Sequence, residues 1–139
     1  MSDAAEQPIV VSAEDLRELR SVLASGPGTR DREAVDDLES ELDRATVVPR
    51  AQLPGDVVAM NSTVEFEDAN TRRRQLIQLV FPSQAAPGKG RISVVAPVGT
   101  ALLGLRVGQC LDWPVPRGTV RVRILRVVQA FQGGPPKLG

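Results

Sequence analysis

The chain has 139 residues, of which 42% are apolar but only 3% aromatic, and 17 basic residues balance 17 acidic ones. This length and apolar content predict one main domain with an aliphatic core and a small appendage. One cysteine and no histidine exclude an internal disulfide and argue against most metal sites and against histidine-based acid–base catalysis.

The same composition bears on where the chain works. It contains no run of eighteen apolar residues, so no membrane span is expected, and its acidic start is unlike a secretion signal. A lone Cys110 fits a reducing cytoplasm, and its apolar neighbours predict a buried, inert thiol.

The neutral total conceals a separation of charge along the chain. Residues 1–50 carry twelve acidic and six basic residues, a net charge of −6, whereas residues 51–139 carry five and eleven, a net charge of +6. Such asymmetry indicates either a charged partner for one half or two independently solvated surfaces.

The first 48 residues predict a short antiparallel helical hairpin. Ser12 is a good N-cap for a first helix, and a second helix should start near Thr29 or Asp31. Each helix carries one apolar stripe, formed by Leu16, Leu19 and Leu23 in the first and by Val35, Leu38 and Leu42 in the second. The stripes predict either self-association or packing against the chain's own sheet.

Residues 49–56 read as a linker, 57–132 as a sheet domain and 133–139 as a flexible tail. Alternating apolar residues predict strands near 63–67, 72–81, 92–95, 109–113 and 120–131. Leu76 is expected inside, and Pro114 is expected to end the fourth strand. The predicted fold class is α+β, with a five- or six-stranded, mostly antiparallel sheet around one short helix.

Residues 92–108, here called the elbow, organise this second part. Pro97 should end a strand, a short helix should follow over residues 100–103, and Gly104 should close it. One interpretation makes Leu102, Leu103 and Leu105 simply core. The other also exposes Pro97 and Val98 to a partner, because partner contacts concentrate on loops held by rigid scaffolds.

The elbow carries a family resemblance. Residues 93–104, SVVAPVGTALLG, resemble the "S-P-L-G-x-A-L-L-G" signature in the C-terminal domain of the Gre transcript-cleavage factors. Further blocks occur in the same order: ELDRA at 41–45, DVVAMNS at 56–62, GLRVGQ at 104–109 and DWPVP at 112–116. Together they resemble most the Rnk family, small Gre relatives described as regulators of nucleoside diphosphate kinase. The resemblance spans about Leu42 to Gln132 and implies an FKBP-like, Gre C-terminal-domain-like fold.

The resemblance also implies a partner. In Gre factors a long coiled coil enters the secondary channel of RNA polymerase, and paired acids at its tip help to bind the catalytic Mg²⁺. Here the hairpin tip offers one acid, Asp31, beside Arg30 and Arg32, and each arm reaches only roughly 18–24 Å at 1.5 Å per residue. The chain is therefore expected to be non-enzymatic, with no catalytic residue, metal or cofactor.

The leading hypothesis is a regulator that binds RNA polymerase near the secondary channel and competes with Gre factors without stimulating cleavage. The expected contact residues are in the elbow, where Gly99 and Gly104 shape the backbone: Pro97, Val98, Ala101 and Leu102. Two alternatives stay open: a regulator of nucleoside diphosphate kinase level or activity, and a stimulator of transcript cleavage.

Direct nucleic-acid binding is not favoured by the sequence. The run Arg72-Arg73-Arg74 and the arginines of the last strand could grip phosphates, but no aromatic residues are interleaved for base stacking and the chain is neutral overall. We expect these arginines instead to be solvated charges at strand edges, where they discourage aggregation.

Overall fold

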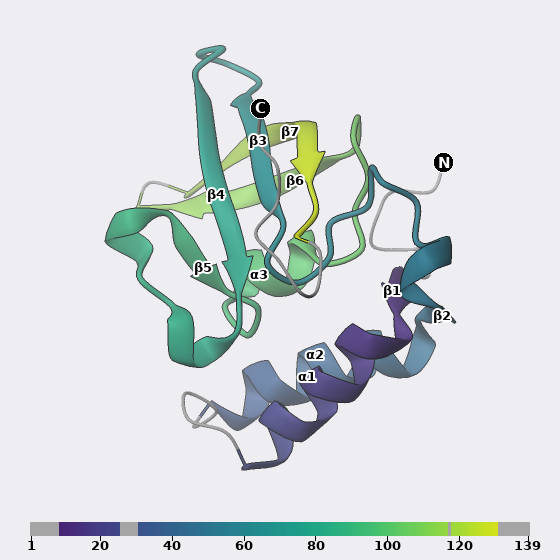
Figure 1. Cartoon of the computed structure of the whole chain (residues 1–139). Coiled ribbons are helices and arrows are strands. Elements are labelled where there is room, and N and C mark those ends of the chain that lie inside the picture. The colour runs from purple at the N-terminus through teal and green to yellow at the C-terminus, as the bar shows by residue number, and fades with distance from the viewer. Residues whose placement is uncertain (1–8, 26–30, 117, 131–139) are drawn as a thin grey trace.

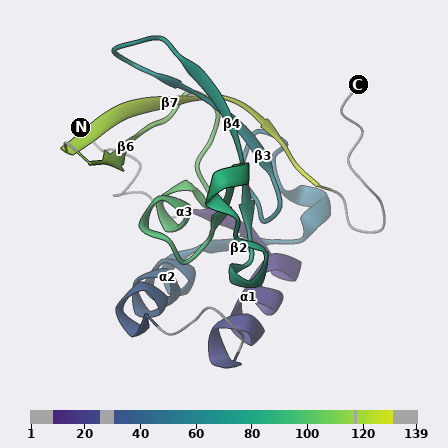
Figure 2. The same ribbon diagram turned by 90° about the vertical axis from the view of Figure 1, so that its left-hand side faces the viewer.

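The computed structural model describes residues 9–25, 31–116 and 118–130. Figure 1 shows two helices, α1 (Ala13–Ser25) and α2 (Arg32–Arg44), side by side beneath a curled sheet. The short helix α3 (Pro97–Leu102) lies between these helices and the sheet, as the turned view in Figure 2 also shows. Among the described residues, no helix is long and apolar enough to cross a membrane.

Short side chains start both long helices. The Oγ of Ser12 accepts a hydrogen bond from the backbone N–H of Asp15 at 3.0 Å, so the predicted first N-cap is confirmed. Asp31 caps α2, because its Oδ1 accepts from the N–H of Ala34 at 3.0 Å. Arg30 and the rest of the connection between the helices lie outside the described residues.

The apolar stripes of α1 and α2 are buried within the chain itself. Leu19 and Leu38 are fully covered and belong to the same core cluster as Val64 and Ile124 of the sheet. Of the two roles that the sequence left open for these stripes, packing on the chain's own sheet domain is the one observed, and α2 contacts α3 there.

A small parallel ladder holds the two ends of the helix pair together. Strand β1 (Val10–Ser12) precedes α1, strand β2 (Thr46–Val48) follows α2, and Val11 pairs with Val47. The N–H of Thr46 also donates to the carbonyl oxygen of Ile9 at 2.8 Å. The sequence analysis did not predict this pairing.

The main sheet has five strands in the order β5-β4-β3-β7-β6. All neighbours are antiparallel except β4 and β5, which are parallel. The bounds are β3 (Thr63–Asp68), β4 (Arg74–Val80), β5 (Arg91–Ser93), β6 (Cys110–Val115) and β7 (Gly118–Val128). The predicted mixed class of helices and sheet is confirmed.

Alternation along the strands separates core from solvent. Val64 and Phe66 of β3 point inward, as predicted, and so do Ile77 and Leu79 of β4. Leu76 is 56% exposed, so the expectation that it lies inside is wrong. It neighbours Ile77, and consecutive side chains of a strand point to opposite faces.

Three local expectations around β6 and α3 are also corrected. Helix α3 begins at Pro97 instead of residue 100, since proline suits the first turn, where its missing N–H is not needed. Strand β6 continues through Pro114 because it is an edge strand and that residue need not donate to a further neighbour. Cys110 is only partly buried.

Gly99 allows α3 to lie directly against the chain that leaves β5. A Cβ at this position would stand 1.9 Å from the carbonyl oxygen of Ser93 and 2.9 Å from the Cα of Val94. Both contacts are with backbone, so the clash could be relieved only by moving the helix. The Oγ1 of Thr100 donates to the carbonyl oxygen of Val94 at 2.8 Å and fixes the same approach.

We expect Gly99→Ala to destabilise the fold by about 1–3 kcal/mol or more, because overpacked sites must shift backbone. Urea unfolding should measure the loss. Gly88→Ala is the matched control, since a Cβ there meets nothing within 4 Å. Equal stability of Gly99→Ala and Gly88→Ala would contradict this account of α3.

Candidate functional site

Helix α3 divides the expected contact residues into two pairs. Pro97 and Ala101 are exposed on one side, whereas Val98 is 8% exposed and Leu102 fully buried on the other. Residues four apart share a helix face, so each pair points in one direction. The expectation that Val98 is exposed is therefore corrected, and Leu102 belongs to the core. Contact of the elbow with RNA polymerase stays a prediction.

The core interpretation of the elbow leucines is confirmed. Leu103 and Leu105 are both buried, like Leu102. Backbone bonds tie this stretch to the segment before β3: the N–H of Val58 donates to the carbonyl oxygen of Leu105 at 2.8 Å, and the N–H of Gly104 donates to that of Val58 at 2.9 Å. The exposed residues Pro97 and Ala101 are thus held in place by a buried, hydrogen-bonded segment.

Gly104 brings the N-terminal segment against the elbow. Its φ is +84°, in the left-handed region that favours glycine, and a Cβ would stand 2.4 Å from the Cβ of Ile9. Ile9 immediately precedes β1, so this contact packs the start of the helix pair against the residues that follow α3.

A groove of about 450 Å³ opens between α2, α3 and β6. Helix α2 forms one wall and α3 another, while buried leucines of the elbow and of β6 form the floor. The lining residues are Ile9, Asp37, Ser40, Glu41, Pro97, Thr100, Ala101, Leu103, Leu105, Cys110, Leu111, Asp112 and Arg121. The exposed pair of α3 therefore borders a groove that neither α2 nor the sheet could form alone.

The rim of this groove is acidic. Asp37 and Glu41 stand on the α2 side, where Arg44 pairs with Glu41, and on the opposite side Asp112 pairs with Arg121 at 3.2 Å. Nothing in the local sequence pattern reveals that α2 packs beside α3, so the sequence alone does not place Asp37 and Glu41 at a groove. The groove thus combines an apolar floor with a mostly negative rim.

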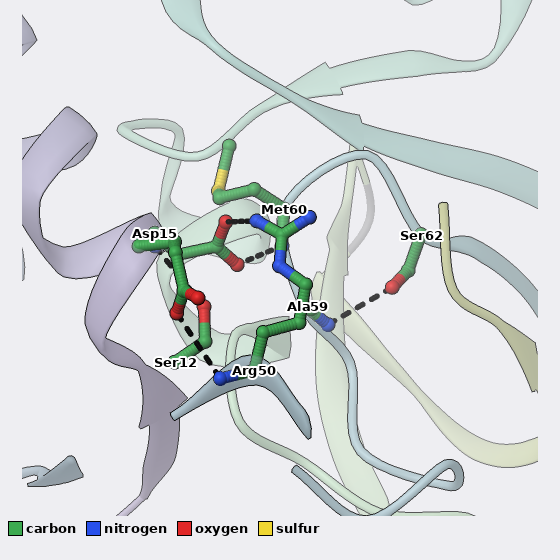
Figure 3. Close-up of polar contacts among 7 residues, drawn as sticks. Ser12, Asp15, Arg50, Ala59, Met60 and Ser62 are labelled. Atoms are coloured by element: carbon green, nitrogen blue, oxygen red, sulfur yellow. Dashed lines mark hydrogen bonds and ion pairs between the residues drawn. The ribbon is translucent and has the colours of Figure 1, made fainter. Parts of the chain in front are cut away.

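A buried carboxylate joins the helix pair to the sheet-bearing part, as Figure 3 shows. The Oδ2 of Asp15 accepts from the backbone N–H of Met60 at 3.0 Å, and its Oδ1 faces the guanidinium of Arg50 at 3.5 Å. The N–H of Arg50 donates to an oxygen of Glu14 at 3.1 Å. The sequence analysis named only Ser12 here, as an N-cap, whereas the side chain of Asp15 reaches across the junction.

Burial raises the pKa of Asp15 above its ordinary value of 3.8. The hydrogen bond from Met60 and the charge of Arg50 lower this pKa, while Glu18 and Glu14 raise it further. Desolvation is the largest of these effects, so the charged carboxylate is held at the junction at a cost.

The tip acid has a structural role. Asp31 accepts the Ala34 N–H as the cap of α2, which engages one of its carboxylate oxygens. Within residues 9–25, 31–116 and 118–130, no three cysteine, aspartate or glutamate side chains gather as metal ligands.

Comparison with known proteins gives matches along both parts of the chain. The family "Transcription elongation factor, GreA/GreB, C-term" matches residues 53–129, and "Rnk N-terminus" matches residues 7–48. The regulator of nucleoside diphosphate kinase of Escherichia coli strain K12 is 39% identical over 97 residues, which cover 70% of this chain and 71% of that protein.

Two further relatives extend the comparison. The transcription inhibitor protein Gfh1 of Thermus aquaticus is 32% identical over 123 residues, covering 87% of this chain and 77% of its own. The solved structure of a prokaryotic transcription elongation factor GreA/GreB from Nitrosomonas europaea superposes with a TM-score of 0.75 at 39% identity, covering 87% of this chain and 98% of that one.

We predict that Asp15→Asn becomes more stable relative to the natural chain as pH rises. The pKa of Asp15 is raised on folding, so protonation of its carboxyl group favours the folded state. This contribution to the free energy of unfolding is fully present below pH 3.8 and is lost as the pH rises through the raised pKa. Asparagine keeps an acceptor for Met60 but carries no charge. Urea unfolding at several pH values should reveal the divergence, and a difference that does not change with pH would contradict it.

Asp15→Ala separates the hydrogen bond from the charge. It leaves the buried N–H of Met60 without its acceptor, which should cost about 1–3 kcal/mol of unfolding free energy. If Ala and Asn at this position had equal stability, the bond across the junction would not matter.

Proposed function

We propose that this chain, which belongs to the family of Rnk and the GreA/GreB transcription elongation factors, is a non-enzymatic transcription regulator that binds RNA polymerase. Binding takes place near the secondary channel, through the groove beside α3. The chain competes there with Gre factors and does not stimulate transcript cleavage. Its place of work is the cytoplasm, where its proposed partner acts.

The groove is the observation that carries the proposal. It lies mostly within the segment that matches the GreA/GreB family, and it presents Pro97 and Ala101 beside an apolar floor. Protein interfaces typically combine an apolar centre with a polar rim. The acidic rim formed by Asp37 and Glu41 favours a polymerase surface with basic residues around an apolar centre.

We expect no stimulation of transcript cleavage because the helix pair is short and carries few carboxylates that could reach a polymerase-bound Mg²⁺. Helices α1 and α2 have 13 residues each, or about 20 Å at 1.5 Å per residue. Binding of Mg²⁺ at a polymerase centre needs carboxylates brought to the ion. Asp31 is the one acid in residues 25–32, and one of its oxygens caps α2. Helices α1 and α2 therefore lie at the entrance of the secondary channel and do not reach the catalytic metal.

A second candidate is regulation of nucleoside diphosphate kinase. It is supported by the printed name of the relative that is 39% identical. Direct binding would predict a complex of the two purified proteins without polymerase. Regulation through transcription would give no such complex and is compatible with polymerase binding.

Ala101→Arg should weaken binding to core RNA polymerase by about tenfold or more. The residue is exposed on α3, so the substitution spares the core, and the new guanidinium would be drawn toward Asp37 and Glu41 and fill the groove. Biolayer interferometry with immobilised polymerase measures the change.

The matched control is Ala85→Arg, the same substitution at an exposed alanine outside the groove lining. It should bind as the natural chain does. Equal loss in both variants would point to a general charge effect, and no polymerase binding by the natural chain would overturn the proposal. Purified nucleoside diphosphate kinase on a parallel sensor tests the second candidate.

Backtracked polymerase complexes should show no shortening of their RNA when this chain is added. Asp31→Asn is the informative variant, because asparagine still caps a helix but removes the carboxylate charge. RNA shortening by the natural chain that disappears in Asp31→Asn would mean that the tip does reach the metal.

A further inference from the structure

One face of the sheet is crowded with arginines. Cross-strand pairs place Arg74 of β4 opposite Glu67 of β3, and Glu67 opposite Arg123 of β7. The next row pairs Glu65 with Arg126. We call this outward surface, with the adjoining turn, the arginine face; its basic members are Arg72, Arg73, Arg74, Arg123 and Arg126.

The two glutamates of the arginine face lie beneath its guanidinium groups. The side chain of Glu67 is 12% exposed, whereas those of Arg72 and Arg74, which pair with it at 3.3 and 3.6 Å, are 74% and 63% exposed. Glu65 is 25% exposed under Arg126, which is 63% exposed and 3.6 Å away. A molecule that approaches this face therefore meets guanidinium groups before carboxylates.

The arginine face thus carries a net positive charge of two, from five arginines set against Glu65, Glu67 and, at the start of the turn, Asp68. A guanidinium has five N–H donors in a planar fork, so a bond to a glutamate below leaves donors free above. Phosphate oxygens match this fork in charge and geometry. The glutamates also hold the arginines in place before any ligand arrives.

The arginine face is turned away from the acidic helices. Figure 1 shows the β3–β4 hairpin projecting from the body on the side opposite to α1 and α2, and Figure 2 agrees. Charges more than about 8 Å apart are largely screened at physiological salt. The acids of α2 therefore do little to repel an anion at this face, although the chain as a whole is neutral.

We propose that the arginine face binds the phosphate backbone of nucleic acid without sequence preference. This goes beyond the proposed docking on polymerase and does not depend on it. The absence of interleaved aromatic residues, which counted against nucleic-acid binding in the sequence, removes base stacking but leaves phosphate contacts intact.

An acidic protein surface is the less suitable occupant. Cores of protein interfaces are depleted in charged residues, whereas nucleic-acid interfaces are strongly positive. Among the described residues of the arginine face and the strands beneath it, Leu76 is the one large apolar side chain that is well exposed. There is thus no apolar centre around which a protein could pack.

Fluorescence anisotropy with a labelled 20-base-pair DNA duplex tests the proposal, with single-stranded RNA of equal length as a second probe. Both should bind at low salt, with affinity falling on the order of a hundredfold between 50 and 200 mM salt for about four phosphate contacts. Arg72→Gln/Arg74→Gln/Arg123→Gln should weaken binding about tenfold or more and lower the salt slope by about one per arginine.

The matched control removes three arginines from the helix pair instead: Arg17→Gln/Arg20→Gln/Arg44→Gln. It changes net charge equally but leaves the arginine face intact, so it should bind nearly as well as the natural chain. Thermal melting checks that both triple variants fold.

Absence of binding at low salt would overturn the proposal, and so would equal losses in the two triple variants. Poly-glutamate that binds with the same affinity and salt slope as DNA would show a surface for acidic polypeptides and would also overturn it.

Discussion

The junction between the helix pair and the sheet is the constraint on which the remaining structure depends. It rests on a close apolar contact between Gly104 and Ile9 and on a carboxylate, Asp15, that crosses to the backbone of Met60. The first contact needs a glycine at positive φ, and the second needs a buried hydrogen-bond acceptor at position 15. Loss of either contact would weaken the junction between the two parts.

The candidate site is a product of that junction. Its apolar floor comes from the elbow, but the acidic wall comes from α2, which is far away in the chain. A groove built between two parts is as rigid as the contact that joins them. This explains why the structure retains a desolvated carboxylate at position 15: an apolar replacement would avoid the cost of burial but would leave the Met60 N–H unsatisfied.

Sequence reasoning succeeded where the cause was local and failed where it was not. The cap at Ser12, the start of the second helix near Asp31 and the alternation of Val64 and Phe66 depend on neighbours a few residues away, and the structure confirms them. The exposure of Val98 was misjudged because it depends on which side of α3 meets the sheet. The same holds for the β1–β2 ladder, the α2 wall of the groove and the reach of Asp15, which all arise from segments brought together by folding.

The acidic residues show why composition alone is a poor guide to function in this chain. Asp31 caps a helix, Asp15 ties two parts together, and Glu67 lies under arginines that it orients. These carboxylates all count equally toward the net charge of zero, yet none of them faces a partner as a free negative group. Acids of α2 such as Asp37 face outward, and the arginine face lies on the opposite side of the molecule. The neutral total is therefore the sum of two surfaces of opposite sign, each suited to a different kind of partner.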